Sequence, residues 1–80
     1  MGRAAITSKE AKLYKIFGKN FRRLRMEKGY TQKKISTLLK VHLSMVQKVE
    51  HGSTTFSLYT IVRVCALLDC TFEDLTNRNK

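Results

Sequence analysis

Hydrogen-bond donors dominate the chemistry that this sequence offers, and several of them recur at helical spacing in the segment 43–50. At about 100° per residue, a helix over this segment turns its polar side chains to one side and its valines to the other. Lysine donates to guanine O6 or N7, glutamine pairs with adenine, serine suits either base, and leucine touches a thymine methyl group. These side chains can therefore meet the base edges of duplex DNA, and the competing interpretation is a merely solvated polar face. The predicted base contacts are Leu43, Ser44, Gln47 and Lys48.

The remaining reactive residues do not indicate catalysis or metal binding. His42 and His51 have no carboxylate, serine or cysteine partner at a suitable spacing. Cys65 and Cys70 stand five residues apart, which is neither a zinc nor a redox spacing, so we expect small core residues. The sequence also lacks a phosphate-binding loop and paired carboxylates. We therefore expect no enzymatic activity, no metal and no cofactor.

The net charge of +10 is distributed unevenly along the chain. Residues 1–50 hold 13 of the 16 lysines and arginines against three acidic residues, whereas residues 51–80 hold three of each sign. An excess of this size favours a polyanionic partner, because its self-repulsion is otherwise uncompensated. Part of the excess forms a strip on the predicted first helix, which faces either water or a neighbouring stretch of duplex. The strip consists of Lys12, Lys15, Lys19, Arg22 and Arg23.

Length and composition indicate one folded domain over residues 1–80. Hydrophobic residues make up 42% of the chain and charged residues 28%, which is typical of a globular protein. No apolar run approaches the roughly 18 residues of a membrane span, and the N-terminus lacks the apolar segment of a secretory signal. We expect a cytoplasmic protein that does not bind membranes. Its frayed ends are predicted at about residues 1–6 and 77–80.

Helical periodicity accounts for the first third of the chain. Thr7 or Ser8 can cap a first helix, and Glu10 has the spacing that completes a capping box with Thr7. Gly29 supplies the C-terminal stop, while Gly18 predicts a point near which the helix breaks or begins. The predicted apolar face carries Leu13, Ile16, Phe17, Phe21 and Leu24.

Further helices follow in quick succession. A second helix runs from its N-cap Thr31 to about Leu39, and a third covers about 43–50 and ends at Gly52. Thr71 can cap a last turn. No segment alternates with period two for long enough to predict a strand, so the expected class is all-α. The fourth helix is predicted from the spacing of Leu58, Ile61, Val64, Cys65 and Leu68.

Two short helices joined by a tight turn, at about 31–51, have the arrangement that inserts the second helix into the major groove. The stretch from Arg22 to Leu75 resembles the Cro/repressor-type (XRE-like) helix-turn-helix family. This resemblance implies a compact five-helix lambda-repressor-like DNA-binding domain and a small transcriptional regulator, either a repressor or a controller. The matching residues are Leu24, Arg25, Gly29, Tyr30, Thr31, Gln32, Ile35, Val41, Val46, Val49, Glu50 and Gly52, followed by Ile61, Val64, Leu68 and Leu75.

The sequence departs from the family pattern at two positions. Ser36 stands where the family prefers alanine, and Lys40 stands in the turn where the family prefers glycine. If that turn position needs a left-handed backbone, a lysine there costs on the order of 1 kcal/mol.

The resemblance also assigns roles outside the base-reading face. Gln32 matches a glutamine whose amide contacts a phosphate at the N-terminus of the second helix. Arg25 and Glu50 match a partly buried ion pair, which fixes orientation more than it adds stability. The other predicted phosphate contacts are Lys33, Lys34, His42, Ser53, Thr54 and Thr55.

One recognition helix offers too little surface for tight specific binding. We therefore expect a twofold homodimer on a palindromic double-stranded operator, with half-sites about 34 Å apart. Its interface is predicted around Phe72 and Leu75, where hydrophobic residues remain after the core is filled. The competing interpretation is an antitoxin or protein-interaction module with the same fold, while RNA binding is disfavoured because the outward face carries no stacking aromatics. No small-molecule ligand is implied.

Overall fold

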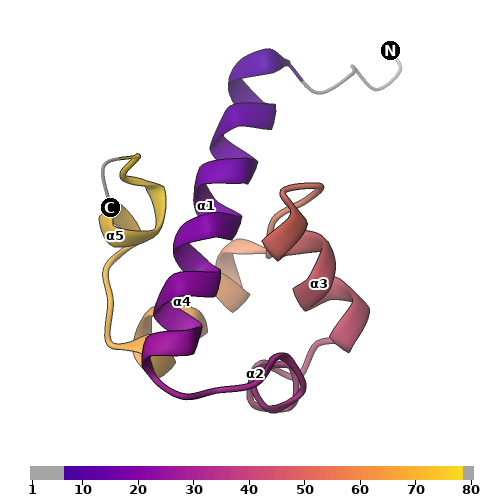
Figure 1. The fold of residues 1–80 in the computed structure, drawn as a ribbon, viewed down its shortest axis with the longest axis vertical. Helices are drawn as coiled ribbons and strands as arrows, with labels where there is room; N and C mark the ends of the chain where they lie inside the picture. The colour runs from indigo at the N-terminus through magenta and orange to yellow at the C-terminus, as the bar shows by residue number, and fades with distance from the viewer. Residues whose placement is uncertain (1–6, 79–80) are drawn as a thin grey trace.

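Five helices joined by short turns and loops make up the described chain, residues 7–78 of a computed structural model, in which no strand occurs (Figure 1). The long helix α1 is flanked by α3 and α5, α2 lies near its C-terminal end, and α4 lies behind it (Figure 1). The expected all-α class is confirmed. None of the described helices is long and apolar enough to cross a membrane. The helices are α1 (Ser8–Glu27), α2 (Gln32–Leu39), α3 (Leu43–His51), α4 (Leu58–Leu68) and α5 (Phe72–Thr76).

Local capping sequences set where several helices begin. The Thr7 hydroxyl accepts a hydrogen bond from the Glu10 backbone N–H at 3.1 Å, and the Glu10 carboxylate accepts one from the Thr7 N–H at 2.8 Å. This confirms the predicted capping box of α1. Thr71 and Asp74 form the same reciprocal pair at α5, and the Thr31 hydroxyl caps α2 through the Lys34 N–H. Each cap satisfies backbone donors that the first helical turn leaves without an intrahelical partner.

The turn between α2 and α3 contains a lysine in a left-handed conformation. Lys40, the C-cap of α2, has φ +60° and ψ +42°, where a Cβ atom costs on the order of 1 kcal/mol relative to glycine. Its backbone N–H satisfies carbonyl oxygens at the end of α2. The left-handed backbone explains why the family prefers glycine at this position. This chain adopts the same conformation with a lysine.

Gly18 does not interrupt α1, so the predicted break was wrong. The helix is continuous from Ser8 to Glu27. Gly18 lies instead where α1 passes closest to α3: a Cβ atom built there would overlap the carbonyl oxygen of Val49 and press on the backbone of Glu50. Gly18 therefore allows α3 to pack this close to α1. A residue with a side chain would have a higher helix propensity, but its Cβ atom would not fit here.

Aromatic rings from α1 and from the α3–α4 loop form the centre of the core. The rings of Phe21 and Phe56 meet edge to face with centroids 5.2 Å apart, and Phe17 stacks on Phe21 at 6.5 Å. Such offset and edge-to-face arrangements suit the quadrupoles of the rings. Buried aliphatic residues from every other helix surround them: Ile35, Leu39, Val46, Val49, Ile61, Val64, Leu68 and Leu75.

Two residues assigned to apolar faces are exposed, and these assignments were wrong. Leu13 is 43% exposed because the first turns of α1 extend beyond α3 and α5 (Figure 1). Leu58 is 74% exposed because it lies in the first turn of α4, ahead of the buried positions, which begin at Thr60. Helical spacing alone identified the wheel position but not the point along the helix at which packing starts.

A buried asparagine, which sequence reasoning missed, attaches α5 to α1. The side-chain amide of Asn20 is 3% exposed and donates to the backbone oxygens of Leu75 and Asn77, at 3.0 Å each. These hydrogen bonds satisfy the N–H groups of the buried amide, which would be costly to bury without partners. The available signal was a polar residue inside the apolar stripe of α1.

Candidate nucleic-acid interface

One side of α3 anchors the helix and the other side is presented to solvent. Val46 and Val49 are fully buried, which fixes the rotation of α3 about its axis. The opposite side chains, predicted as base contacts, are all exposed: Leu43, Ser44, Gln47 and Lys48. The surface they form offers a cation, an amide, a hydroxyl and an apolar edge, which are the groups that read base edges in a major groove.

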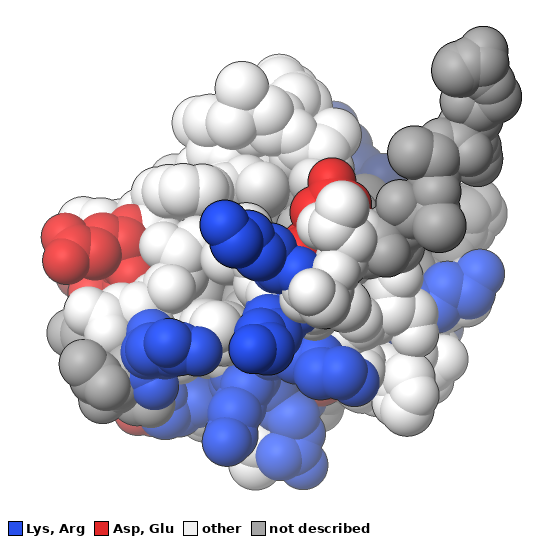
Figure 2. Space-filling view, turned by 90° about the horizontal axis from the view of Figure 1, so that it is seen from above, with Lys and Arg blue, Asp and Glu red and all other residues white. Residues whose placement is uncertain are grey.

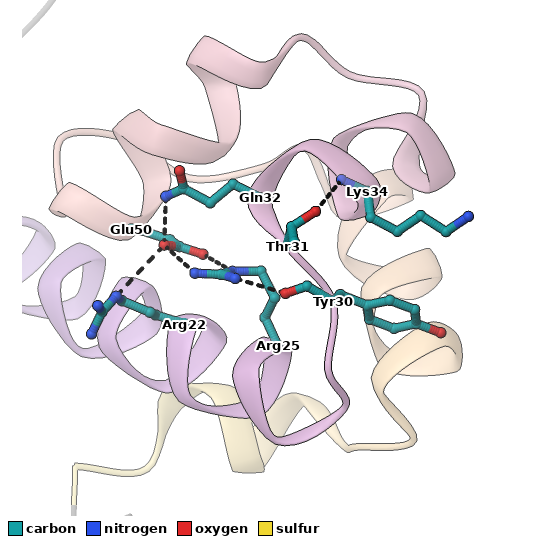
Figure 3. A network of polar contacts seen from close by, with 7 residues as sticks. All are labelled: Arg22, Arg25, Tyr30, Thr31, Gln32, Lys34 and Glu50. Atoms are coloured by element: carbon teal, nitrogen blue, oxygen red, sulfur yellow. Dashed lines mark hydrogen bonds and ion pairs between the residues drawn. The ribbon is translucent and has the colours of Figure 1, made fainter.

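A buried ion pair sets the position of α3 relative to α1 (Figure 3). The Arg25 Nε donates to Glu50 Oε2 at 2.6 Å, and its Nη2 donates to Glu50 Oε1 at 3.1 Å. The side chains are only 9% and 5% exposed. The third guanidinium nitrogen, Nη1, donates to the carbonyl oxygen of Tyr30 at 2.7 Å, just before α2 begins. The pair is bidentate, a geometry that fixes orientation as well as distance.

Gln32 joins the same network rather than pointing freely outward. Its Nε2 donates to Glu50 Oε1 at 2.9 Å, so the first residue of α2 is tied to the last turns of α3 (Figure 3). A side-chain amide carries two N–H groups, and this bond uses one. Gln32 therefore has a positioning role that sequence reasoning did not identify, in addition to the phosphate contact that was predicted.

The other predicted phosphate contacts border the exposed side of α3 at two places. Lys33 and Lys34 lie exposed in the first turn of α2, where backbone N–H groups also favour an anion. The loop residues Ser53 to Thr55 directly follow α3, and Ser53 is exposed while Thr54 and Thr55 are half-buried. His42 is the exposed N-cap of α3, and its side chain makes no capping hydrogen bond.

The C-terminal residues predicted as a dimer surface divide into one exposed and one buried side chain. Phe72 is 55% exposed, but Leu75 is fully buried. The assignment of Leu75 to an interface was therefore wrong: α5 turns this residue against α1, where Asn20 also holds its carbonyl oxygen. The other large apolar side chains that are exposed in the C-terminal part of the chain lie on α4: Leu58, Tyr59 and Val62.

The two cysteines are half-buried and unbridged. Burial, together with the neighbouring Cys65, raises the pKa of Cys70 to about 12. Its thiol therefore stays protonated near neutral pH, which makes it a weak nucleophile and a weak metal ligand. Within residues 7–78, no cluster of three or more histidine, cysteine or acidic side chains has an arrangement for holding a metal ion.

Comparisons with known proteins give a consistent fold and family. A family model described as helix-turn-helix matches residues 21–75. The restriction-modification controller protein C.AhdI from Aeromonas hydrophila is 32% identical, with a TM-score of 0.70 over 78% of this chain and 94% of that chain. The hypothetical transcription factor NHTF from Neisseria has a TM-score of 0.73 over 95% of this chain and 86% of its own, and its 22% identity supports similarity of fold alone. Among curated proteins no match was found.

Proposed function

This chain belongs to the helix-turn-helix family and is a DNA-binding transcriptional regulator, and we propose that it recognises a specific duplex sequence by inserting α3 into the major groove. The observation that carries the proposal is the outward side of α3, because its exposed polar residues lie opposite two fully buried valines. Leu43, Ser44, Gln47 and Lys48 are the proposed base contacts. We further propose that this takes place in the cytoplasm, with neither cofactor nor catalysis.

Phosphate contacts on both sides of α3 are proposed to fix the register of docking. Those at the start of α2 are Gln32, Lys33 and Lys34, and those at the ends of α3 are His42 and the loop residues Ser53 to Thr55. Phosphate contacts carry no base identity, so they position the helix while α3 reads. The ion pair between Arg25 and Glu50 acts indirectly, because it holds α3 against α1 and makes no contact with DNA in this proposal.

A second copy of the chain is the proposed partner in DNA binding. The exposed apolar residues Leu58, Tyr59, Val62 and Phe72 occupy the part of the chain, residues 51–80, in which acidic and basic residues balance. Two copies of a +10 chain can approach most closely across that neutral region, since their basic regions repel each other. A twofold axis there pairs two α3 helices with a palindromic site.

Within this function, we propose the narrower role of a restriction-modification controller. The 32% identity to C.AhdI, over 94% of that protein, favours this role over a phage repressor or an antitoxin. The role predicts that genes for a restriction endonuclease and its methyltransferase lie beside the gene for this chain. Neighbouring genes encoding a toxin instead would contradict it.

The test of DNA binding is a salt titration on duplex DNA, with single-stranded RNA of the same length as the matched probe. Each phosphate neutralised by a lysine or arginine releases counterions, so log K should fall linearly with log salt, at roughly 0.9 per contact. We expect a steep slope reflecting several contacts, and a site enriched from random duplex that binds more tightly than bulk duplex. A flat response, or stronger binding to the RNA, would remove duplex DNA as the partner.

A further inference from the structure

We propose that four residues of the basic strip of α1, Lys12, Lys15, Lys19 and Arg22, form a second DNA-binding surface that contacts phosphates beside the bases read by α3. The fifth residue, Arg23, is left out because it pairs with Glu27, and the strip below means these four residues. This inference rests on the proposed function and extends it: the protein would contact duplex that lies outside the reach of its recognition helix. The contact would be independent of sequence, because phosphates are the same at every base pair.

The lysines of the strip carry positive charge that no ion pair within residues 7–78 compensates. Lys12, Lys15 and Lys19 are all exposed, and no acidic side chain in the described residues forms an ion pair with any of them. The acidic residues of α1 are engaged elsewhere, since Glu10 closes the capping box and Glu27 pairs with Arg23 at 3.3 Å. Figure 2, which views the molecule from the end where α1 begins, shows lysine and arginine side chains gathered on one side.

The strip adjoins the end of the recognition helix. A Cβ atom built on Gly52, the C-cap of α3, would lie 2.8 Å from Lys15 Cγ and 3.2 Å from Lys15 Cα. The side chain of Lys15 therefore starts directly over the residue that precedes the proposed phosphate loop. One end of the strip is further tied to α3 by Arg22, whose Nε lies 4.0 Å from Glu50 Oε1. A duplex held by α3 and its following loop would therefore pass close to Lys15 and Arg22.

The shape of α1 extends this surface beyond the core. The first turns of the helix rise above α3 and α5 in Figure 1. At 1.5 Å per residue, the ten helical steps from Lys12 to Arg22 rise about 15 Å. Spacings of three, four and three residues keep these cations on one side of the helix. Lys12, Lys15 and Lys19 precede residues 21–75, which match the family model, so they add to the family's own binding surface.

Nucleic-acid phosphates suit the strip better than a membrane surface does. A basic helix that binds lipid needs a free apolar face to insert between headgroups. The apolar face of α1 is used in the core, where Phe17 and Phe21 are almost fully buried. Lysine side chains are flexible point charges that attract phosphate without demanding a fixed geometry. The strip therefore has the properties of a backbone contact.

The test compares two double variants that each remove two positive charges. The strip variant is Lys12→Gln with Lys19→Gln, and the control is Lys28→Gln with Arg78→Gln, at exposed positions outside the strip. Lys15 is left intact because its stem covers Gly52. Glutamine is a good helix former, so α1 should persist, and circular dichroism checks this. Binding is measured on random-sequence duplex and on a site selected from it, over a series of salt concentrations.

We expect the strip variant to bind both duplexes more weakly by about the same factor. Loss of two phosphate contacts should flatten its slope of log K against log salt by about 1.8, whereas the control should change the slope far less. Equal slopes for the two variants would overturn the proposal. If the unmodified protein shows no salt-dependent duplex binding at all, the proposed function itself fails. If that protein binds and the two variants behave alike, only the strip is refuted.

Discussion

The region from α1 to α3 and the region of α4 and α5 differ in the contacts that hold their helices together and in the side chains that their surfaces expose. Between α1 and α3, a buried arginine and a buried glutamate meet across the helix interface, and the outer surface is strongly basic. In α4 and α5, the buried side chains are mostly apolar and large apolar side chains are exposed, and residues 51–80 hold three basic and three acidic residues. The first region has the features of a surface that meets a polyanion, and the second has the features of a surface that meets another protein molecule.

The difference also concerns how each region fixes its orientation. The position of α3 depends on directional bonds: Glu50 accepts from Arg25 and from Gln32. A helix that must present particular side chains to base edges gains from such directional restraint. The position of α5 depends on burial of Leu75 and on one amide, that of Asn20, which bonds backbone oxygens.

The largest effect is expected from breaking the buried ion pair. Arg25→Ala leaves the Glu50 carboxylate buried without its main partner, which should lower the free energy of unfolding by about 3–5 kcal/mol. The matched control is Arg22→Ala. The Arg22 side chain is 61% exposed and its Nε lies 4.0 Å from Glu50 Oε1, so its loss should cost less than about 1 kcal/mol. Urea denaturation of both variants gives the comparison. Similar losses for the two arginines would show that burial does not set the strength of this network.

The next largest effect is expected on the apolar surface of α4. Val62→Glu should weaken self-association roughly a hundredfold, about 2.7 kcal/mol, because two like charges would face each other near the twofold axis. Met26→Glu is the control, since it also replaces an exposed apolar side chain but on α1. Sedimentation equilibrium measures both variants. If Val62→Glu associates as strongly as the unmodified protein, the dimer surface lies elsewhere. If the unmodified protein is monomeric even on DNA, there is no dimer surface.

The features that the sequence predicted correctly are those decided by neighbouring residues. The capping box of Thr7 and Glu10 and the stop at Gly29 each depend on a few adjacent positions. The residues that were assigned wrongly or missed depend on contacts distant in sequence. Gly18 is required by the backbone of α3, and Asn20 by one carbonyl oxygen within α5 and one directly after it.

The same distinction applies to the candidate site. The outward side of α3 follows from a helical wheel, because both valines that define the buried side lie within the helix. The bond from Gln32 to Glu50 and the burial of Leu75 follow from how separate helices meet. Contacts between separate helices are not encoded in the spacing of neighbouring residues. The sequence therefore predicted a phosphate contact for Gln32 but not its positioning role, and it placed Leu75 in an interface rather than in the core.

The division of roles between α3, which reads bases, and its surroundings, which position it, is tested most directly with Lys48→Ala and Gln32→Ala. The binding of each variant is measured on a selected site and on its single-base variants. Lys48 is exposed opposite the buried valines, so its loss should leave the melting temperature almost unchanged. We predict a loss of about 1–3 kcal/mol on the preferred site and much less on sites altered at the contacted base pair. Gln32→Ala should weaken binding to every site about equally. If Lys48→Ala also weakens every site equally, Lys48 contacts a phosphate and the division of roles is contradicted for this residue.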